Sequence, residues 1–185
     1  TEGLPTMAAA GAYHSSFKEE DAATFAGGCA VLPIRTTCRG PAPALESGAE
    51  DIIDEAIYLF KANVLFRNFE VKGPADRLLV YLTLYISECL RRIEGARGKA
   101  EALKALTNMA LEAFPIPGDA SFPLGPYFPT PESKQEADFI RSYLRQLREE
   151  TGRRMIDKCY PDGETTPSKW WIAFSKRRFM NKSLS

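Results

Sequence analysis

The sequence predicts a mainly α-helical fold, a single small domain in which one central helix is surrounded by others. A chain of 185 residues is long enough for one hydrophobic core. Eight of the nine residues in 78–86 are apolar, and a helix that is apolar nearly all round is usually buried on most sides. Further segments with helical patterns flank this stretch. We therefore divide the chain into an irregular N-terminal segment (1–28) and one helical domain (29–185) that ends in a docking tail (167–185).

The N-terminal part of the chain shows no helical period. Residues 1–28 are rich in Ala, Gly, Thr and Ser, and we expect them to be irregular. Residues 29–37 predict an extended segment, which Pro33 restricts to a sheet edge or an isolated strand. The run Gly40-Pro41-Ala42-Pro43 predicts a stiff linker to the first helix.

The first helix is predicted to begin after Ser47. Ser47 and Glu50 have the spacing of a capping box, and Asp51 adds negative charge at the helix N-terminus. Apolar residues continue at helical spacing to about Phe69, and Gly73 then interrupts the pattern.

Two more helices are predicted before the middle of the chain ends. Pro74 suits the first turn of a second helix, which we expect to run to about Ile93 and to form the centre of the domain. Gly95 and Gly98 break the chain after it. The segment 99–113 has the high intrinsic helix propensity of a third helix.

A proline-rich loop separates the third helix from a fourth. Residues 114–131 contain six prolines and four aromatic residues, and we expect an ordered loop because aromatic rings favour burial. Thr130-Pro131-Glu132 supplies a cap, a first-turn proline and an acidic residue for the fourth helix. Gly152 suggests a bend or an end within it. The ion pairs expected on its exposed part are Arg145–Glu149, Glu149–Arg153 and Glu150–Arg154.

Charge and cysteine content limit the classes of function. Lys and Arg together number 24, as do Asp and Glu, so the net charge of zero argues against a general nucleic-acid binder. The densest apolar stretch is too short to span a bilayer, and no signal-peptide pattern is visible. The four cysteines form no CxxC pair and are expected to be free thiols. We expect a soluble cytoplasmic protein with no membrane and no nucleic-acid partner.

The residues offer little to catalysis. His14 is the single histidine and lies in the irregular segment, and the cysteines are far apart, so we predict no catalytic residue, no cofactor and no metal. Ala100 follows Gly98-Lys99 where a phosphate-binding loop requires Ser or Thr. An enzyme stays a weak alternative, with His14 and either Cys29 or Cys38 as its candidates. The acidic residues near the first helix are interpreted as capping and helix-dipole charges: Asp51, Asp54 and Glu55.

The tail 167–185 carries the clearest sign of a contact surface. It holds both tryptophans and five cations with no acidic residue, and large aromatics and Arg are enriched in interface cores. The candidate interface residues are Trp170, Trp171, Lys176, Arg177, Arg178, Phe179, Met180 and Lys182. We expect at least one tryptophan to fill the chain's own core and the cationic end to face a partner. The alternative function is a helical module that binds single-stranded nucleic acid, or proteins in general, through this basic aromatic tail.

Several longer blocks occur in a fixed order across nearly the whole chain. They are Tyr13-His14-Ser15-Ser16, Leu32-Pro33-Ile34-Arg35, Gly40-Pro41-Ala42-Pro43, Asp54-Glu55-Ala56-Ile57-Tyr58, Phe60-Lys61-Ala62-Asn63-Val64, Leu84-Tyr85-Ile86-Ser87-Glu88-Cys89-Leu90, Phe114-Pro115-Ile116-Pro117-Gly118, Pro167-Ser168-Lys169-Trp170-Trp171 and Phe179-Met180-Asn181-Lys182-Ser183-Leu184-Ser185. In this order they resemble one family, subunit 3 of the actin-related protein 2/3 complex. Colinear blocks of this length are more specific than any short motif.

The resemblance implies a small helical fold with one helix enclosed by others. It also implies a noncatalytic structural subunit of an assembly that nucleates branched actin filaments. In that family the subunit packs against actin-related protein 3 and lies near the mother filament, so the expected partners are actin-related protein 3, the other subunits and the actin filament. The expected location is the cytoplasmic actin cytoskeleton, including cell projections.

Overall fold

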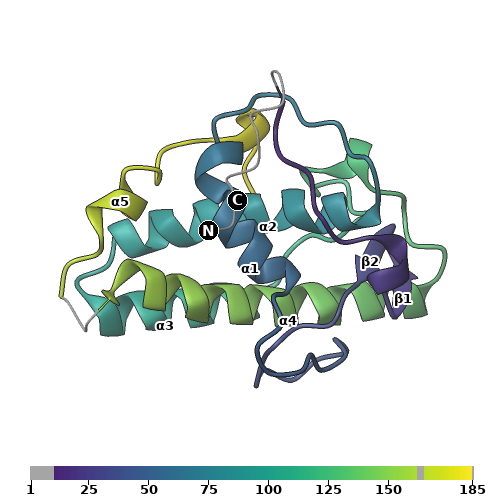
Figure 1. The fold of residues 1–185 in the computed structure, drawn as a ribbon, viewed down its shortest axis with the longest axis horizontal. Coiled ribbons are helices and arrows are strands. Elements are labelled where there is room, and N and C mark those ends of the chain that lie inside the picture. The colour runs from purple at the N-terminus through teal and green to yellow at the C-terminus, as the bar shows by residue number, and fades with distance from the viewer. Residues whose placement is uncertain (1–10, 162–164, 185) are drawn as a thin grey trace.

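The computed structural model describes residues 11–161 and 165–184, so the first ten residues of the segment predicted as irregular lie outside the described residues. The fold is mainly helical, as predicted, with one small β-hairpin (Figure 1). The elements in chain order are η1 (Glu19–Asp21), β1 (Thr24–Ala26), β2 (Cys29–Val31), α1 (Ile52–Asn63), α2 (Pro74–Glu94), α3 (Lys99–Leu111), η2 (Gly125–Tyr127), α4 (Lys134–Cys159), α5 (Lys169–Ile172) and η4 (Phe179–Asn181).

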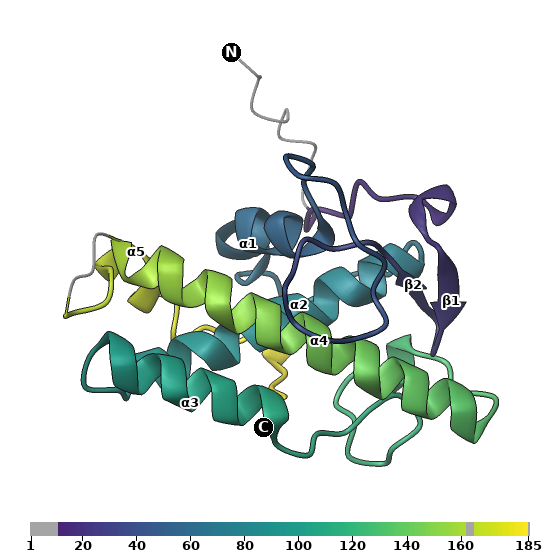
Figure 2. The same ribbon diagram turned by 90° about the horizontal axis from the view of Figure 1, so that it is seen from below.

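Helix α2 is the centre of the fold. Every residue in 78–90 is buried, and the helix contacts α1, α3, α4, α5 and β2. Figure 2 shows α4 lying beside α3, with α1 on the other side of α4. The prediction of one apolar helix surrounded by others is therefore confirmed, since α2 begins at Pro74 as expected and ends at Glu94. Within the described residues, no helix is both long enough and apolar enough to cross a membrane.

The N-terminal region contains a hairpin that the sequence did not predict. Strand β1 pairs antiparallel with β2, and Gly27 and Gly28 make the turn with φ values of 56° and 75°, which favour glycine. The expectation of irregular structure up to residue 28 is thus wrong at β1, whereas the extended character expected after residue 28 is correct. The Tyr143 hydroxyl fastens the end of this hairpin to α4, because it accepts from Leu32 N at 3.0 Å and donates to Leu32 O at 2.9 Å.

Helix α1 begins later and ends earlier than predicted. Its N-cap is Asp51 and not Ser47: the Asp51 carboxylate accepts from Asp54 N, and the Asp54 carboxylate accepts from Asp51 N, so these two residues form the capping box. The helix ends at Asn63 and not at Phe69. The Asn63 side chain instead binds the N-terminal segment through both the N–H and the carbonyl of Tyr13.

Helix α4 starts at a different cap and is continuous. Ser133, not Thr130, caps it by accepting from Glu136 N at 3.1 Å. The helix passes through Gly152 to Cys159, and a Cβ at Gly152 would lie 3.5 Å from Leu106 Cβ of α3, an ordinary contact distance between two packed helices. Of the three predicted ion pairs, only Glu150–Arg154 is present among the described residues, and it is largely buried.

The loop between α3 and α4 is ordered and contributes to the core. Helix α3 ends at Leu111, two residues before the predicted end at 113. The rings of Phe122 and Phe128 are both buried and meet edge to face with 5.2 Å between centroids. Phe122 also stacks on Tyr81 of α2 at 6.4 Å. The loop is thus ordered, as its aromatic content predicted, and it covers one side of the central helix.

Candidate functional site: the C-terminal tail

The tail is fastened to the domain along its whole described length. Ser168 N donates to Cys159 O at 2.7 Å, which holds the single turn of α5 against the end of α4. Ser175 is buried and its hydroxyl donates to Glu94 at 2.8 Å. Figure 1 shows the tail then turning back toward the middle of the molecule, where Met180 N donates to Phe66 O at 3.0 Å. This backbone path fixes which tail side chains face outward.

The two tryptophans have different environments. Trp171 is half-buried and stacks on Phe60 of α1 with 6.2 Å between ring centroids, and the Lys61 ammonium lies 4.2 Å above the Trp171 ring. Phe174 meets the same Phe60 edge to face at 6.3 Å. Trp170 is 80% exposed, so of the two tryptophans only Trp171 packs against the chain's own core, and it does so half-buried at the edge.

Phe179 and Met180 belong to the core of this chain. Phe179 is fully buried and lies edge to face with Phe69 at 5.8 Å. Met180 is buried with a left-handed backbone, φ 56° and ψ 22°, which is uncommon for a residue with a side chain. We therefore reassign these two candidate interface residues as anchors of the tail. Nothing in the local sequence signals this burial, because it depends on the left-handed turn.

The cations of the tail face solvent around a shallow hollow. Lys176, Arg177 and Arg178 are exposed, and together with Arg67 they line a hollow of about 320 Å³ beside Leu65. Lys182 lies apart, with its ammonium 5.9 Å from the ring of Tyr127. In the part of the chain that the structure describes, none of the four cations of the hollow forms an ion pair.

The hollow is chemically suited to an acidic surface with an apolar edge. Four uncompensated positive charges in one place repel one another, and an anionic partner relieves that repulsion. Leu65 is 57% exposed beside them and offers apolar area. The sequence pointed to the three tail cations but not to Arg67 and Leu65, because only the folded chain brings the segment after α1 against the tail. We call this surface, made of Leu65, Arg67, Lys176, Arg177 and Arg178, the cationic hollow.

Of the weak catalytic candidates, His14 has a structural role, and the two cysteines have thiol pKa values raised by burial. His14 Nδ1 lies 2.7 Å from the buried Asp76 carboxylate of α2, which also accepts from Ser15 N, so His14 fastens the N-terminal segment. Burial raises the pKa of the Cys29 thiol to about 12, against an opposing effect of Arg77, so the thiol is protonated at neutral pH. Burial likewise raises the pKa of Cys38. Within 11–161 and 165–184 no group of three or more His, Cys, Asp or Glu residues is placed to hold a metal ion.

Comparison with known proteins gives one consistent result. The family model P21-Arc, described as "ARP2/3 complex ARPC3 (21 kDa) subunit", matches residues 10–184. The "Actin-related protein 2/3 complex subunit 3" of Arabidopsis thaliana is 50% identical over 169 residues, which cover 91% of this chain and 97% of the relative. The proteins of the same name from Dictyostelium discoideum and Saccharomyces cerevisiae are 50% and 43% identical, and each match covers more than nine-tenths of both chains.

Proposed function

This chain belongs to the P21-Arc family, subunit 3 of the actin-related protein 2/3 complex, and from that premise we propose that it is a noncatalytic structural subunit which packs against actin-related protein 3 close to the mother filament. Its role is to help hold together an assembly that nucleates branched actin filaments. The resemblance noted in the sequence supports the choice of neighbour. The protein then acts in the cytoplasmic actin cytoskeleton, including cell projections.

The observation that carries this proposal is the cationic hollow on a fixed tail. Trp171, Phe174 and Phe179 pack against the core and hold the tail in place, so its cations are presented without a large loss of conformational entropy on binding. Surfaces of one charge steer and orient a partner of the opposite charge. We propose that the cationic hollow contacts an acidic patch on an actin-related or actin subunit.

The test of membership in the complex is mild affinity purification of the tagged full-length protein from its own cells. We expect actin-related proteins to be recovered in near-equal amounts with it. Recovery of the tagged protein without actin-related proteins, under conditions in which the fold stays intact, contradicts the proposal.

Binding of single-stranded nucleic acid fits the tail less well. Such binding needs several free aromatic faces beside the cations, because successive bases stack on them. Here the Trp171 ring is already in contact with Phe60 and Lys61, and Phe179 is inside the core. Trp170, at 80% exposure, is therefore the one largely exposed aromatic ring of the described tail. A short oligonucleotide added to the purified chain is therefore expected to bind weakly in a fluorescence anisotropy titration.

A further inference from the structure

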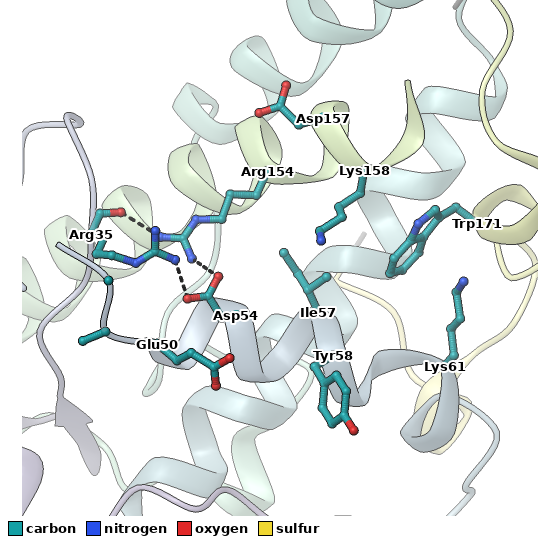
Figure 3. Close-up of a pocket in the computed structure, with 12 residues that line it drawn as sticks. Arg35, Glu50, Asp54, Ile57, Tyr58, Lys61, Arg154, Asp157, Lys158 and Trp171 are labelled. Carbon is teal, nitrogen blue, oxygen red and sulfur yellow. Dashed lines mark hydrogen bonds and ion pairs between the residues drawn. The ribbon is translucent and has the colours of Figure 1, made fainter. Parts of the chain in front are cut away.

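A second and larger hollow lies between α1 and the C-terminal half of α4 (Figure 3). Its volume is about 680 Å³, which falls within the range of roughly 300–1,000 Å³ that is usual for binding pockets. Trp171 closes one end, and Arg35 and Arg154 border the other end, where both guanidinium groups bind Asp54. We call this hollow the α1–α4 groove. Of the residues that the structure describes, none lines both this groove and the cationic hollow.

The groove offers an apolar surface in its middle. Ile57 forms part of its lining and is packed into the core below, and Tyr58 stands beside it with 70% of its surface exposed. The Trp171 ring forms a wall, and it is held in place by Phe60. Aromatic residues beside a pre-formed hollow often contribute most of the free energy of protein–protein binding.

The charges of the groove are separated along its length. The ammonium groups of Lys61 and Lys158 lie at the Trp171 end, and neither forms an ion pair with a carboxylate of the described residues. At the opposite end the Asp54 carboxylate is paired with Arg35 and Arg154, and Glu50 is exposed at the rim. Asp157, the neighbour of Lys158 in the sequence, also lines the groove, is exposed, and forms no ion pair within the described residues. Two uncompensated positive charges therefore border the aromatic wall.

We propose that the α1–α4 groove holds a segment of a neighbouring subunit that places a large apolar side chain on Ile57 and against Trp171, and a carboxylate between Lys61 and Lys158. This inference rests on the proposed function, since it takes the occupant from the same assembly, and it adds a second contact surface to the cationic hollow. A protein segment is favoured because the groove pairs apolar area at Ile57 and Trp171 with the two lysines at its Trp171 end, which can receive a negative charge.

Site-specific photocrosslinking tests the occupant in the intact complex. Tyr58 is replaced by p-benzoylphenylalanine in the full chain, the complex is purified and irradiated, and the crosslinked peptide is identified by mass spectrometry. We expect one neighbouring subunit, with a carboxylate close in sequence to a large apolar residue. The same photoreactive residue at Leu103, which is exposed on α3, is the matched control and is expected to give a different peptide or none.

Charge reversal tests the two lysines. Lys61→Glu with Lys158→Glu is expected to lower the yield of the Tyr58 crosslink at least about tenfold, which corresponds to roughly 1.4 kcal/mol or more of binding free energy. The control Lys104→Glu on the exposed face of α3 leaves the yield unchanged. If the double reversal lowers the melting temperature, Lys61→Gln with Lys158→Gln replaces it, and a smaller loss in the same direction is expected.

The outcomes separate this inference from the proposed function. If actin-related proteins are recovered with the chain and Tyr58 gives no crosslink, the groove is not an interface and the proposed function stands. A crosslink to a second copy of this chain, or to a peptide without a carboxylate near the apolar residue, also overturns the inference. If no actin-related protein is recovered, the proposed function fails and the inference fails with it.

Discussion

Arg154 binds Asp51 through both terminal guanidinium nitrogens, since Arg154 Nη1 lies 2.7 Å from Asp51 Oδ1 and Arg154 Nη2 lies 2.7 Å from Asp51 Oδ2. Asp51 is fully buried and is the N-cap of α1, whereas Arg154 belongs to α4. The same guanidinium binds Glu150, Asp54 and the carbonyl of Arg35. One arginine thus joins the start of α1, the C-terminal half of α4 and the segment after β2.

Removing this arginine is expected to destabilise the protein strongly. Arg154→Ala leaves the Asp51 carboxylate buried without its counterion, and breaking a buried pair in this way typically lowers the free energy of unfolding by about 3–5 kcal/mol. The matched control is Arg153→Ala, because Arg153 is exposed and its one hydrogen bond within the described residues goes to the Thr37 hydroxyl. Arg153→Ala is expected to change the free energy of unfolding by no more than about 0.5 kcal/mol. Urea unfolding of both variants measures the difference, and similar losses contradict the assignment.

The Asp51 pair also predicts a dependence of stability on pH. Burial by itself raises the pKa of Asp51, but hydrogen bonds from Arg154, Asp54 N and Arg35 N outweigh this effect. The pKa of Asp51 in the folded protein is therefore lowered. A carboxyl with a lowered folded pKa stabilises the fold above its unfolded pKa, about 3.9, and this contribution is lost as the pH falls through the folded pKa.

We therefore expect the free energy of unfolding to decrease as the pH is lowered below about 5, and to decrease less steeply in Asp51→Asn. The measurement is a series of urea titrations between about pH 7 and about pH 3. Parallel curves for the two proteins would falsify the role given to this carboxylate.

The two tryptophans are predicted to differ in stability effect although they are neighbours. Trp171→Ala removes the stack on Phe60 and the cation–π contact with Lys61, and we expect a loss of about 2 kcal/mol, less than the 3–5 kcal/mol of a fully buried ring. Trp170→Ala is expected to change the free energy of unfolding by less than about 0.5 kcal/mol, because the ring is 80% exposed. Thermal or urea unfolding compares them directly, and equal losses would contradict the two environments.

The cations of the hollow are predicted to matter for assembly and not for folding. Reversal of Lys176, Arg177 and Arg178 to Glu is expected to weaken association with the complex at least about tenfold and to lower the density of actin branches, with an unchanged unfolding curve of the isolated chain.

A control with the same change in net charge reverses three exposed cations elsewhere: Arg97, Lys104 and Lys134. Co-purification and a branching assay by fluorescence microscopy give the readout. Assembly and branch density that are unchanged, or that fall equally in both triple variants, remove the specific role of the cationic hollow.

Local sequence predicted those parts of the fold that local physics determines. The apolar run of α2 and its N-terminal Pro74 are local signals, and that helix was located within one residue at its C-terminal end. The predicted start of α1 is wrong because two capping patterns follow one another in the sequence, Ser47 to Glu50 and Asp51 to Asp54. The Gly48 backbone at φ 93° breaks the first pattern, and Arg154 stabilises the second from α4.

The candidate site was likewise predictable only where it depends on local sequence. The cations of the tail are visible in the sequence, and the resemblance to a family supplied the functional class. The burial of Phe179 could not be predicted, because it requires the left-handed turn at Met180 and a contact with Phe69 that is far away in the chain. The position of Arg67 in the cationic hollow could not be predicted either, because it depends on a contact with tail residues that are far away in the chain.

Two glycines are predicted to respond oppositely to the same added methyl group. Gly152 is helical, and a Cβ there would lie 3.5 Å from Leu106 Cβ, an ordinary contact, so Gly152→Ala is expected to raise the free energy of unfolding by up to about 1 kcal/mol through helix propensity. Gly28 has φ 75°, and a Cβ there would lie 2.2 Å from Pro129 Cδ, which forces the hairpin away from the proline-rich loop. Gly28→Ala is therefore expected to lower the free energy of unfolding by about 2 kcal/mol or more. Urea unfolding of the two variants decides between this account and a bend at Gly152, because a bend that requires glycine would make both substitutions destabilising.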